Sequence, residues 1–364
     1  MQIMGIIFID NIIFYLQKSG GISVVWYELI SRLLAESKCL VRFVEYRTKA
    51  ENIFYNKLAL VNKQKFFMRL FCLNVQRFLP VKLPGIHVPF IFHSSYYRYS
   101  TDSKAINITT VHDFTYEYYC SGVAKWLHCW QKYRAIRHSD YIICISENTK
   151  KDLLKFLPDI DEYKISVIYN GVSDDYFPMS NNISDLPFFK NEYLLFVGSR
   201  SGYKNFKFTI DVLKAIKTKK LVIVGSPLTS KEIKELDLNV GRNRYTCVGR
   251  VSNERLNCLY NNAFALLYPS YYEGFGIPIL EAQKAGCPVI AYNSSSIREI
   301  MGENSLKLDE LTVDAVERCF CLLEDEKTRK EIITAGLENA KKYTWDNMYL
   351  QIRNLYQKAL NMSK

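Results

Sequence analysis

Two glutamates eight positions apart, Glu273 and Glu281, are the residues of this chain whose type and spacing best suit chemistry on a ligand. They lie in the segment 269–291, PSYYEGFGIPILEAQKAGCPVIA, which directly follows an apolar run typical of a strand. A carboxylate accepts hydrogen bonds from hydroxyl groups such as those of a sugar or a ribose. A lone glutamate would more often solvate one face of a helix, so the interpretation depends on what surrounds the pair.

Around the two glutamates, the sequence places glycines and the signals of a helix. Gly274 and Gly276 allow backbone amides to approach a ligand closely. Pro278 suits the first turn of a helix and Gly286 suits its end, which predicts a short helix over 277–285. The amino end of a helix favours an anion. The segment therefore combines a diphosphate site with two hydroxyl-binding carboxylates, which is what a nucleotide sugar requires.

Two further loops carry groups suited to phosphate. Arg200 and Lys204 follow a predicted strand and supply the fixed positive charge that a leaving diphosphate needs, with a solvated basic loop as the alternative. Gly20 and Gly21 directly precede a predicted helix over 22–35, so their amides can approach phosphate, with a plain tight turn as the alternative. The G-x-G-x-x-G dinucleotide fingerprint does not occur in the chain.

Other polar residues stand near predicted strand ends. His112 ends an apolar strand, where a buried structural histidine is the usual interpretation. Asp113 suits a cap of the next segment, and Ser146 directly precedes a predicted helix and is at least its N-cap. Tyr271 and Tyr272 either flank a bound sugar or pack on the rim of the site.

Taken together, these motifs resemble glycosyltransferase family 4, whose members are retaining enzymes of the GT-B fold. Glu273 and Glu281, with Gly-Phe-Gly after the first of them, are similar to the E-x7-E signature of that family. The spacer Ser201-Gly202-Tyr203 stands where acidic or other polar residues are also common, which leaves the shape of that loop open. The resemblance runs through most of the chain, and its other positions are Ser19-Gly20-Gly21-Ile22, Val111-His112-Asp113, Asn170-Gly171-Val172, and Gly198 and Arg200 with Lys204-Asn205.

The resemblance implies a role for each matching residue. Glu273 would hold the donor sugar, Glu281 would hold the ribose, His112 would face the donor sugar, and Asp113 would lie on the acceptor side. The catalytic residues would be His112, Glu273, Arg200 and Lys204. The remaining donor-binding positions would be Gly20, Gly21, Gly274, Phe275, Gly276 and Ile277.

The implied reaction needs neither a metal nor a cofactor. Negative charge grows on the leaving diphosphate, so Arg200, Lys204 and the helix-end amides would stabilise the transition state more than the ground state. The leaving phosphate could itself accept the proton of the acceptor. No covalent enzyme intermediate is then required, and the transition state resembles an oxocarbenium ion.

The elements that position these residues alternate between short β-branched runs and helical stretches, which predicts parallel sheets with crossover helices. Predicted helices include 22–35, 66–79, 125–137 and 147–157, with two or three more from Thr312 to the end. The predicted strands are 4–9, 40–46, 88–92, 106–111, 141–145 and 165–169 in the first half, and 193–197, 221–224, 245–248, 264–268 and 288–292 in the second half.

A polar, helix-poor connector over 174–187 separates the two series of elements. We therefore expect an α/β protein of GT-B architecture, with two doubly wound, Rossmann-like domains facing a central cleft. The expected parts are 1–175 as an acceptor domain, 176–345 as a nucleotide-sugar donor domain, and 346–364 as a C-terminal helix that packs back toward the N-terminal domain. Ligands of open α/β sheets bind at the carboxyl ends of the strands.

A rival chemistry would bind a divalent metal beside the diphosphate through an Asp-x-Asp motif. Asp159 and Asp161 have that spacing but lie in a charged loop at a predicted helix end, without the preceding apolar strand. We interpret them as surface residues and expect no metal site. The ten cysteines are scattered singly, and the close pair Cys319 and Cys321 has a spacing unsuited to a metal knuckle or a redox motif.

The chain is basic, with a formal net charge of +11 and a pI near 9.0, so acidic partners are favoured. Residues 52–101 contain no Asp or Glu. A basic amphipathic helix on an anionic membrane surface competes there with a helix whose apolar side packs on the first sheet. Nucleic acid is not expected, because no zinc knuckle, RNP-like run or basic recognition helix accompanies the charge. The apolar residues that recur at helical spacing are Phe67, Leu70, Phe71, Val75 and Phe78.

No stretch approaches the roughly 20 apolar residues that cross a bilayer, and the first nine residues lack the basic leader of a signal peptide. With the scattered cysteines, this predicts a cytoplasmic protein, peripheral at the inner membrane face if the basic segment binds lipid.

The expected partners are a nucleotide-sugar donor and a glycan or lipid-linked glycan acceptor. Similarity to mannosyltransferases of surface-polysaccharide biosynthesis, such as O-antigen and lipopolysaccharide pathways, favours GDP-mannose as the donor. UDP-N-acetylglucosamine, UDP-glucose and dTDP-rhamnose are alternatives. Two other functions are a non-catalytic nucleotide-sugar-binding subunit and a nucleotide-sugar epimerase.

Overall fold

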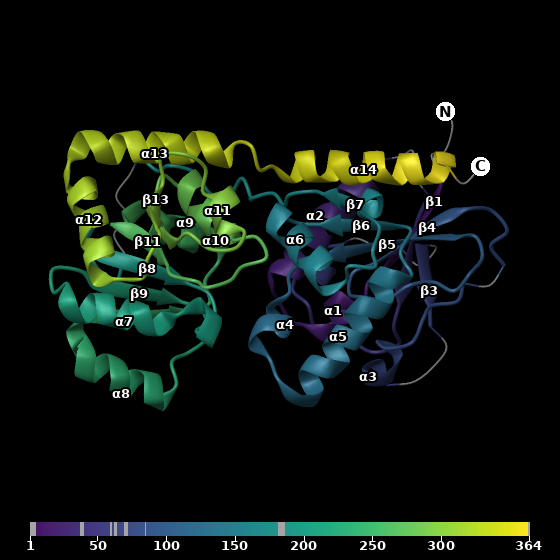
Figure 1. The fold of residues 1–364 in the computed structure, drawn as a ribbon, viewed down its shortest axis with the longest axis horizontal. Coiled ribbons are helices and arrows are strands. Elements are labelled where there is room, and N and C mark those ends of the chain that lie inside the picture. Colours follow the sequence, from purple (N-terminus) through teal and green to yellow (C-terminus); the bar gives the residue numbers. More distant parts are fainter. Residues whose placement is uncertain are drawn as a thin grey trace. The chain divides into compact units, whose positions relative to one another are not determined.

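The computed structural model describes residues 5–36, 40–58, 60–61, 64–68, 72–83, 85–180 and 186–362 (Figure 1). The chain divides into two compact units, one made of residues 1–171 with 345–364 and the other of residues 172–344. Each unit contains one parallel sheet with helical crossovers, so the expected α/β class with two doubly wound sheets is confirmed. Within the described residues, no helix is both long and apolar enough to span a membrane.

The first unit holds a seven-stranded parallel sheet in the order β3–β2–β1–β4–β5–β6–β7. The order reverses between β1 and β4, and ligands of open α/β sheets bind at the carboxyl ends of the strands beside such a switch point. Isoleucine, valine and phenylalanine dominate these strands because helices cover both faces of a parallel sheet. The strands are β1 (Ile6–Asp10), β2 (Leu40–Glu45), β3 (Lys65–Phe67), β4 (Phe90–Ser94), β5 (Ala105–Val111), β6 (Tyr141–Cys144) and β7 (Ile165–Val167).

The helices of the first unit include the last helix of the chain. α14 (Trp345–Met362), yellow in Figure 1, packs on α2 (Gly21–Ala35) and on β4. In this contact, the Tyr356 hydroxyl lies 2.6 Å from Nδ1 of the buried His93. The other helices of the unit are α1 (Ile13–Leu16), α2 (Gly21–Ala35), α3 (Leu73–Gln76), α4 (Thr115–Tyr119), α5 (Gly122–Arg137) and α6 (Glu147–Phe156).

The helix predicted over 66–79 is wrong. Phe66 lies in strand β3 opposite Val44 of β2, and the helix that follows, α3, has only four residues. Leu70 and Phe71 lie outside the described residues. The helical spacing of the apolar residues did not predict this structure, because tertiary contacts stabilise the strand. Phe66 pairs with β2 through the backbone and packs against a buried cluster that contains Val44 and Phe92.

The second unit holds a six-stranded parallel sheet in the order β10–β9–β8–β11–β12–β13. Its order reverses between β8 and β11. Strand β13 was not predicted, because its three residues are too short to show a pattern. The strands are β8 (Tyr193–Val197), β9 (Lys220–Val224), β10 (Tyr245–Gly249), β11 (Ala265–Tyr268), β12 (Val289–Tyr292) and β13 (Leu306–Leu308).

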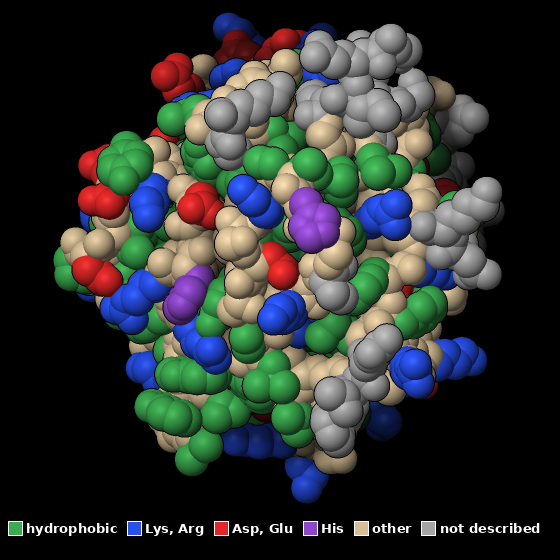
Figure 2. All heavy atoms as spheres, turned by 90° about the vertical axis from the view of Figure 1, so that its right-hand side faces the viewer, with side chains coloured by type: hydrophobic (Ala, Val, Ile, Leu, Met, Phe, Trp, Pro, Cys, Tyr) green, Lys and Arg blue, Asp and Glu red, His purple; other side chains and the backbone are tan. Residues whose placement is uncertain are grey.

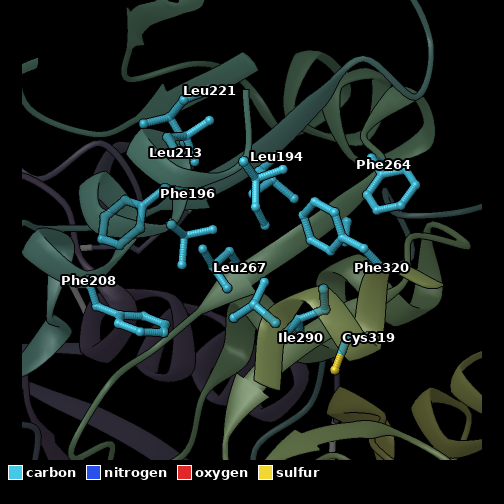
Figure 3. Close-up of a cluster of buried hydrophobic side chains, with 14 of the residues drawn as sticks. Leu194, Phe196, Phe208, Leu213, Leu221, Phe264, Leu267, Ile290, Cys319 and Phe320 are labelled. Atoms are coloured by element: carbon cyan, nitrogen blue, oxygen red, sulfur yellow. The ribbon is translucent and has the colours of Figure 1, made fainter. Parts of the chain in front are cut away.

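One buried cluster joins one face of this sheet to three helices (Figure 3). Leu194 and Phe196 point into it from β8, while Leu195 between them points to the other face, as the period of a strand requires. Leu213 of α7 (Phe206–Ala215) and Phe320 of α12 (Val313–Glu324) close the cluster from the helices. The helices of the unit are α7 (Phe206–Ala215), α8 (Ser230–Asn239), α9 (Asn253–Asn262), α10 (Ile277–Lys284), α11 (Ile297–Ile300), α12 (Val313–Glu324) and α13 (Glu326–Ala340).

Candidate functional site

The carboxyl ends of β8 and β11, neighbours at the switch point of the second sheet, carry most of the predicted site. β8 leads into the 3-10 turn Gly202–Lys204, and β11 leads through the loop 269–276 into α10. The N–H of Tyr271 donates to the carbonyl of Tyr203 over 2.8 Å, which joins the two loops directly. The fold therefore brings together two motifs that are far apart in the sequence.

Lys204 and Glu273 form an ion pair at this junction. Nζ of Lys204 lies 2.5 Å from Oε1 of Glu273 and 3.1 Å from the phenolic oxygen of Tyr268, the last residue of β11. Burial is the largest single influence and disfavours the charge of Lys204, but Glu273, Tyr268 and Tyr203 together outweigh it and raise the pKa of Lys204. Lys204 is therefore a fixed cation in a place that water reaches poorly.

Three serines that sequence reasoning missed hold the loop that carries Glu273. The Ser295 hydroxyl accepts from the N–H of Glu273 over 2.9 Å, and the Ser296 hydroxyl lies 2.9 Å from the carbonyl oxygens of both Glu273 and Phe275. Ser294 donates to another carbonyl of the same loop over 2.8 Å. These serines directly follow β12, so their place at a strand end next to β11 is the signal that would have found them.

The helix predicted after the loop is present as α10. Gly276 is its N-cap with φ of 106°, a conformation that favours glycine, and no side chain caps the helix start at Ile277. The ring of Phe275 is buried and lies 5.9 Å from that of Tyr343, so its side chain belongs to the core. What the segment from Gly274 to Ile277 offers a ligand is therefore its backbone.

Glu281 lies within α10 between two tyrosines. Its Oε2 accepts a hydrogen bond from the Tyr260 hydroxyl over 2.9 Å, and Tyr176 also hydrogen-bonds to it. Burial raises the pKa of Glu281 to about 7, although both hydrogen bonds oppose the rise. This carboxyl group is therefore close to half protonated at neutral pH.

Arg200 is paired with a different acid. Its Nε lies 2.5 Å from Oε1 of Glu232, and its Nη2 lies 3.3 Å from Oε2, while the carbonyls of Ser226 and Pro227 accept from Nη1 and Nη2. Glu232 also completes a capping box with Thr229 at the start of α8. The hydrogen bond from Arg200, before any other cause, lowers the pKa of Glu232 to about 2. Arg200 is thus fixed to the amino end of α8 and not to the glutamate of the loop.

His112 and Asp113 lie in the first unit, directly after β5. His112 is buried, and this burial lowers its pKa to about 4 against the opposing effect of Asp113. No described residue offers a hydrogen-bond partner to its Nε2. Oδ1 of Asp113 accepts from the N–H of Thr115 over 2.8 Å, so Asp113 caps the turn before α4.

The predicted glycine turn also lies in the first unit. α2 begins at Gly21, with Gly20 as its N-cap and no side-chain cap. The backbone of Gly20 is extended, a conformation that any residue can adopt. The backbone conformation therefore does not require glycine at this position. Ser146 caps α6 as predicted, because its hydroxyl accepts from the N–H of Thr149 over 3.0 Å.

The Asp-x-Asp motif lies in a surface loop. Asp159 forms an exposed ion pair with Arg137 at 2.9 Å, and Asp161 precedes a 3-10 turn. Over the ranges that the structure describes, no cluster of three or more His, Cys, Asp or Glu side chains is arranged to hold a metal ion.

Two family models together cover most of the chain. Residues 19–176 match the model described as Glycosyltransferase Family 4, and residues 181–339 match the model described as Glycosyl transferases group 1. The first range contains the glycine turn and His112, and the second contains the Lys204–Glu273 pair.

The similar curated proteins include two bacterial mannosyltransferases. The chain is 40% identical over 111 residues to the O-antigen chain mannosyltransferase B of Escherichia coli. This alignment covers only 30% of the chain and 29% of that relative. It is 27% identical over 256 residues to the O-antigen chain mannosyltransferase RfbU of Salmonella typhimurium, covering 67% of each protein.

Solved structures match over nearly the whole chain. The sucrose-phosphate synthase from Thermosynechococcus elongatus superposes with a TM-score of 0.75 at 17% identity, over 99% of this chain and 100% of that one. HepE from Anabaena, in complex with UDP and glucose, gives a TM-score of 0.70 at 15% identity over 96% and 99%. WaaG, a glycosyltransferase of lipopolysaccharide biosynthesis, gives 0.68 at 14% identity over 96% and 99%. At these identities the likeness shows the fold alone, which is GT-B.

Proposed function

This chain belongs to glycosyltransferase family 4, and from that membership we propose that it transfers a hexose from a nucleotide-diphosphate sugar to a growing surface polysaccharide, with retention of anomeric configuration. The observation that carries the proposal is the ion pair of Lys204 with Glu273 at the switch point between β8 and β11. A cation for phosphate and a carboxylate for sugar hydroxyls stand there within one hydrogen bond of each other.

In this reaction the diphosphate leaves the anomeric carbon as the acceptor hydroxyl arrives on the same face. Lys204, whose raised pKa keeps it charged, stabilises the charge that develops on the leaving phosphate. The uncapped amino end of α10 adds backbone amides to the same anion. Glu273 binds the hydroxyl groups of the donor sugar, so donor binding replaces part of its ion pair with Lys204.

His112 takes part as a neutral imidazole in this proposal. Its low pKa leaves it uncharged at pH 7, so it exchanges hydrogen bonds with the donor sugar and does not compete with Lys204 for phosphate. Its buried Nε2 supports the role, because a buried polar atom ordinarily has a hydrogen-bond partner. Asp113, which caps the next turn, is assigned to the acceptor side.

GDP-mannose is the donor that we favour, and a lipid-linked glycan is the acceptor. The two mannosyltransferase relatives support this choice, although they match at low identity or over a part of their length. The UDP complex of HepE keeps UDP sugars as the alternative. We place the reaction on the cytoplasmic side of a membrane, which is supported by the described cysteines, none of which forms a disulfide.

A thermal-shift screen against nucleoside diphosphates and nucleotide sugars tests the proposal, because a ligand that binds the folded state raises the melting temperature by mass action. We expect GDP and GDP-mannose to give the largest shifts, and Glu273→Gln and Lys204→Met to abolish them. A larger shift with UDP or dTDP ligands would contradict GDP-mannose as the donor. The absence of a shift with every nucleotide would contradict the proposed function.

The metal-free chemistry has its own test. Transfer activity in excess chelator should equal activity with added manganese, since the fixed cations do the work of a metal. Asp159→Asn should also leave activity unchanged, because Asp159 pairs with Arg137 at the surface. Activity that disappears with chelator and returns with manganese would overturn the metal-free mechanism.

A further inference from the structure

Two acid-free stretches of the first unit lie side by side and build one surface. Residues 52–101 contain no acidic residue, and neither does α5. Nε2 of Gln131 donates to the carbonyl of Arg77 over 2.8 Å, which ties α5 to the end of α3. The rings of Phe78 and Trp130 lie 6.4 Å apart across the same contact. Figure 2 views one side of the molecule, where hydrophobic side chains gather at the lower left with basic side chains beside them.

This surface exposes large apolar side chains on both α5 and the segment around α3. Val123, Trp126 and Trp130 occupy positions i, i+3 and i+7 of α5, which share one face of a helix, and they are 77%, 64% and 41% exposed. Val75 of α3 and Leu79, which follows this helix, are also exposed. We call these five residues the apolar ridge. An exposed apolar group of this size marks an interaction site in a protein that is otherwise well packed.

Tryptophan is exposed only in the apolar ridge. The other two tryptophans of the chain, Trp26 and Trp345, are buried in the first unit. Indole rings favour the boundary between an apolar phase and water, where one side of the ring is wet.

Two cations beside the ridge, Lys125 and Arg134, contact backbone carbonyls and form no ion pair with a carboxylate of the residues that the structure describes. Nζ of Lys125 donates to the carbonyl of Glu117 over 2.6 Å, and Nη1 of Arg134 lies 3.4 Å from the carbonyl of Phe78. The Arg134 guanidinium also lies 5.2 Å from the Trp130 ring. Both side chains therefore keep their positive charge available next to the exposed indoles. A partner must then offer an apolar phase and negative charge in adjacent layers.

We propose that the apolar ridge, with Lys125 and Arg134, docks this protein on an anionic lipid bilayer. The indoles lie at the level of the headgroups with their apolar sides toward the acyl chains, and the two cations meet lipid phosphates. A groove of about 760 Å³ beside the ridge, lined by Trp126, Trp130, Tyr133 and Phe156, gives the first part of an acyl or prenyl chain a place to lie. The docking deepens the proposed function, since it brings the site to an acceptor carried on lipid, but it does not depend on transfer.

Flotation of the full chain with phosphatidylcholine vesicles, with and without phosphatidylglycerol, tests the docking without any donor. We expect binding only to the vesicles that contain phosphatidylglycerol, and release as salt rises. Tryptophan fluorescence should shift to the blue and become protected from an aqueous quencher on binding, because only Trp126 and Trp130 are exposed in the free protein. Equal binding to both vesicle types, or none to either, would overturn the proposal.

Matched variants locate the surface. Trp126→Ala with Trp130→Ala should lower the partition onto anionic vesicles by about tenfold or more, because two apolar side chains no longer leave water. The control is Phe189→Ala with Leu238→Ala in the second unit, which removes side chains that are 80% and 85% exposed and should leave flotation unchanged. Lys125→Glu should weaken flotation, while Lys231→Glu on α8 should not.

The outcomes separate this proposal from the proposed function. The tryptophan variants should keep the melting temperature and its shift with nucleotide sugar, since the ridge lies outside the donor-binding residues. Wild-type flotation by the double tryptophan variant would refute the ridge as the docking surface. Concentration-dependent self-association that the tryptophan changes abolish, without vesicle binding by the wild type, would assign the ridge to a second copy of the chain instead.

Discussion

The residues of the proposed donor site differ in how their charges are compensated. Lys204 and Glu273 compensate each other at a single hydrogen bond, whereas Arg200 is held by Glu232 and by two backbone carbonyls. Glu281 instead takes its hydrogen bonds from two tyrosines, Tyr260 and Tyr176. These differences predict different kinetic effects for residues that one motif search would group together.

Glu281 should make donor binding depend on pH near neutrality. Its pKa of about 7 means that the carboxylate, the better acceptor for ribose hydroxyls, forms as the pH rises from 6 to 8. We expect the affinity for a nucleotide sugar to rise about tenfold over that range. Glu281→Gln should remove the dependence, and Glu281→Ala should mainly raise the donor KM, because ribose contacts change little during reaction. Calorimetry should use a nucleotide sugar, which lacks a titrating terminal phosphate.

The same group should act on stability with the opposite sign. Because the folded-state pKa of Glu281 lies above its ordinary value of 4.5, the folded protein binds more protons than the unfolded chain between pH 4.5 and about 7. The contribution of Glu281 to the free energy of unfolding therefore falls as the pH rises through this window. Glu281→Gln should consequently unfold at a higher temperature than the wild type at pH 8, and a lower one would contradict the raised pKa.

Arg200 should matter for turnover through its own charge. Arg200→Ala is expected to lower kcat by roughly 10²–10³, the scale for losing one preorganised group at developing charge. Glu232→Gln is the control, because it removes the ion pair that holds Arg200 at α8 and keeps the guanidinium. Equal losses of kcat in both variants would make the role of Arg200 structural.

Glu232 also contributes to stability. It has a pKa of about 2, so its contribution is present above pH 4.5 and is lost as the pH falls toward 2.

At the scale of elements, the loop with Glu273 depends on a loop from the neighbouring strand. The serines after β12 bind the backbone on both sides of Glu273, so the position of this carboxylate is set by two crossovers and not by its own segment. The N–H of Tyr271 adds a third tie, to the turn that carries Lys204.

Ser296→Ala should therefore lower activity as well as stability. It removes one hydroxyl that serves two carbonyls, which costs about 1–3 kcal/mol of folding free energy. We also expect kcat to fall about tenfold, because Ser296 helps to position the loop that carries Glu273. Ser305→Ala, which removes a single hydroxyl-to-carbonyl bond at a turn of the same unit, is the matched control and should leave kcat unchanged. Thermal unfolding and steady-state kinetics of both variants decide the matter.

At the scale of the whole molecule, the chain leaves its first compact unit at residue 171 and returns to it at Trp345. The returning helix α14 buries Trp345, Met348, Ile352 and Tyr356. The hydrogen bond between Tyr356 and His93 ties it to β4, and a buried hydrogen bond of this kind is expensive to leave unmade. The first unit is therefore complete only when the end of the chain has been added.

Tyr356→Phe should loosen the first unit alone. Losing the hydroxyl leaves Nδ1 of His93 without its partner and should cost about 1–3 kcal/mol. Hydrogen exchange should then rise in β4 and α2 and stay unchanged in the sheet of the second unit. Leu350→Ala, an exposed position of the same helix, should have no effect on either. Equal loosening of both units would contradict the division of the chain at α14.

The sequence by itself determined the class of fold, and it predicted the chemistry that we propose for the loop 269–276. Strands such as β8, and helices such as α2, α5 and α6, were predicted within a few residues because their apolar periods and caps are local properties. The start of α10 at Ile277 was equally local, since Gly276 and Pro278 specify it. The predicted helix over 66–79 failed where a short edge strand, β3, was stabilised by its neighbours instead.

Only the tertiary structure decided which charges meet. The pairing of Lys204 with Glu273, of Arg200 with Glu232, and the raised pKa of Glu281 follow from the order of the strands and from burial, neither of which is written in the spacing of residues along the chain. The serine ties after β12 and the exposed ridge on α5 arise in the same way. A side chain's charge and reach are fixed by its type, but its partners and its exposure to water are set by what the rest of the chain packs beside it.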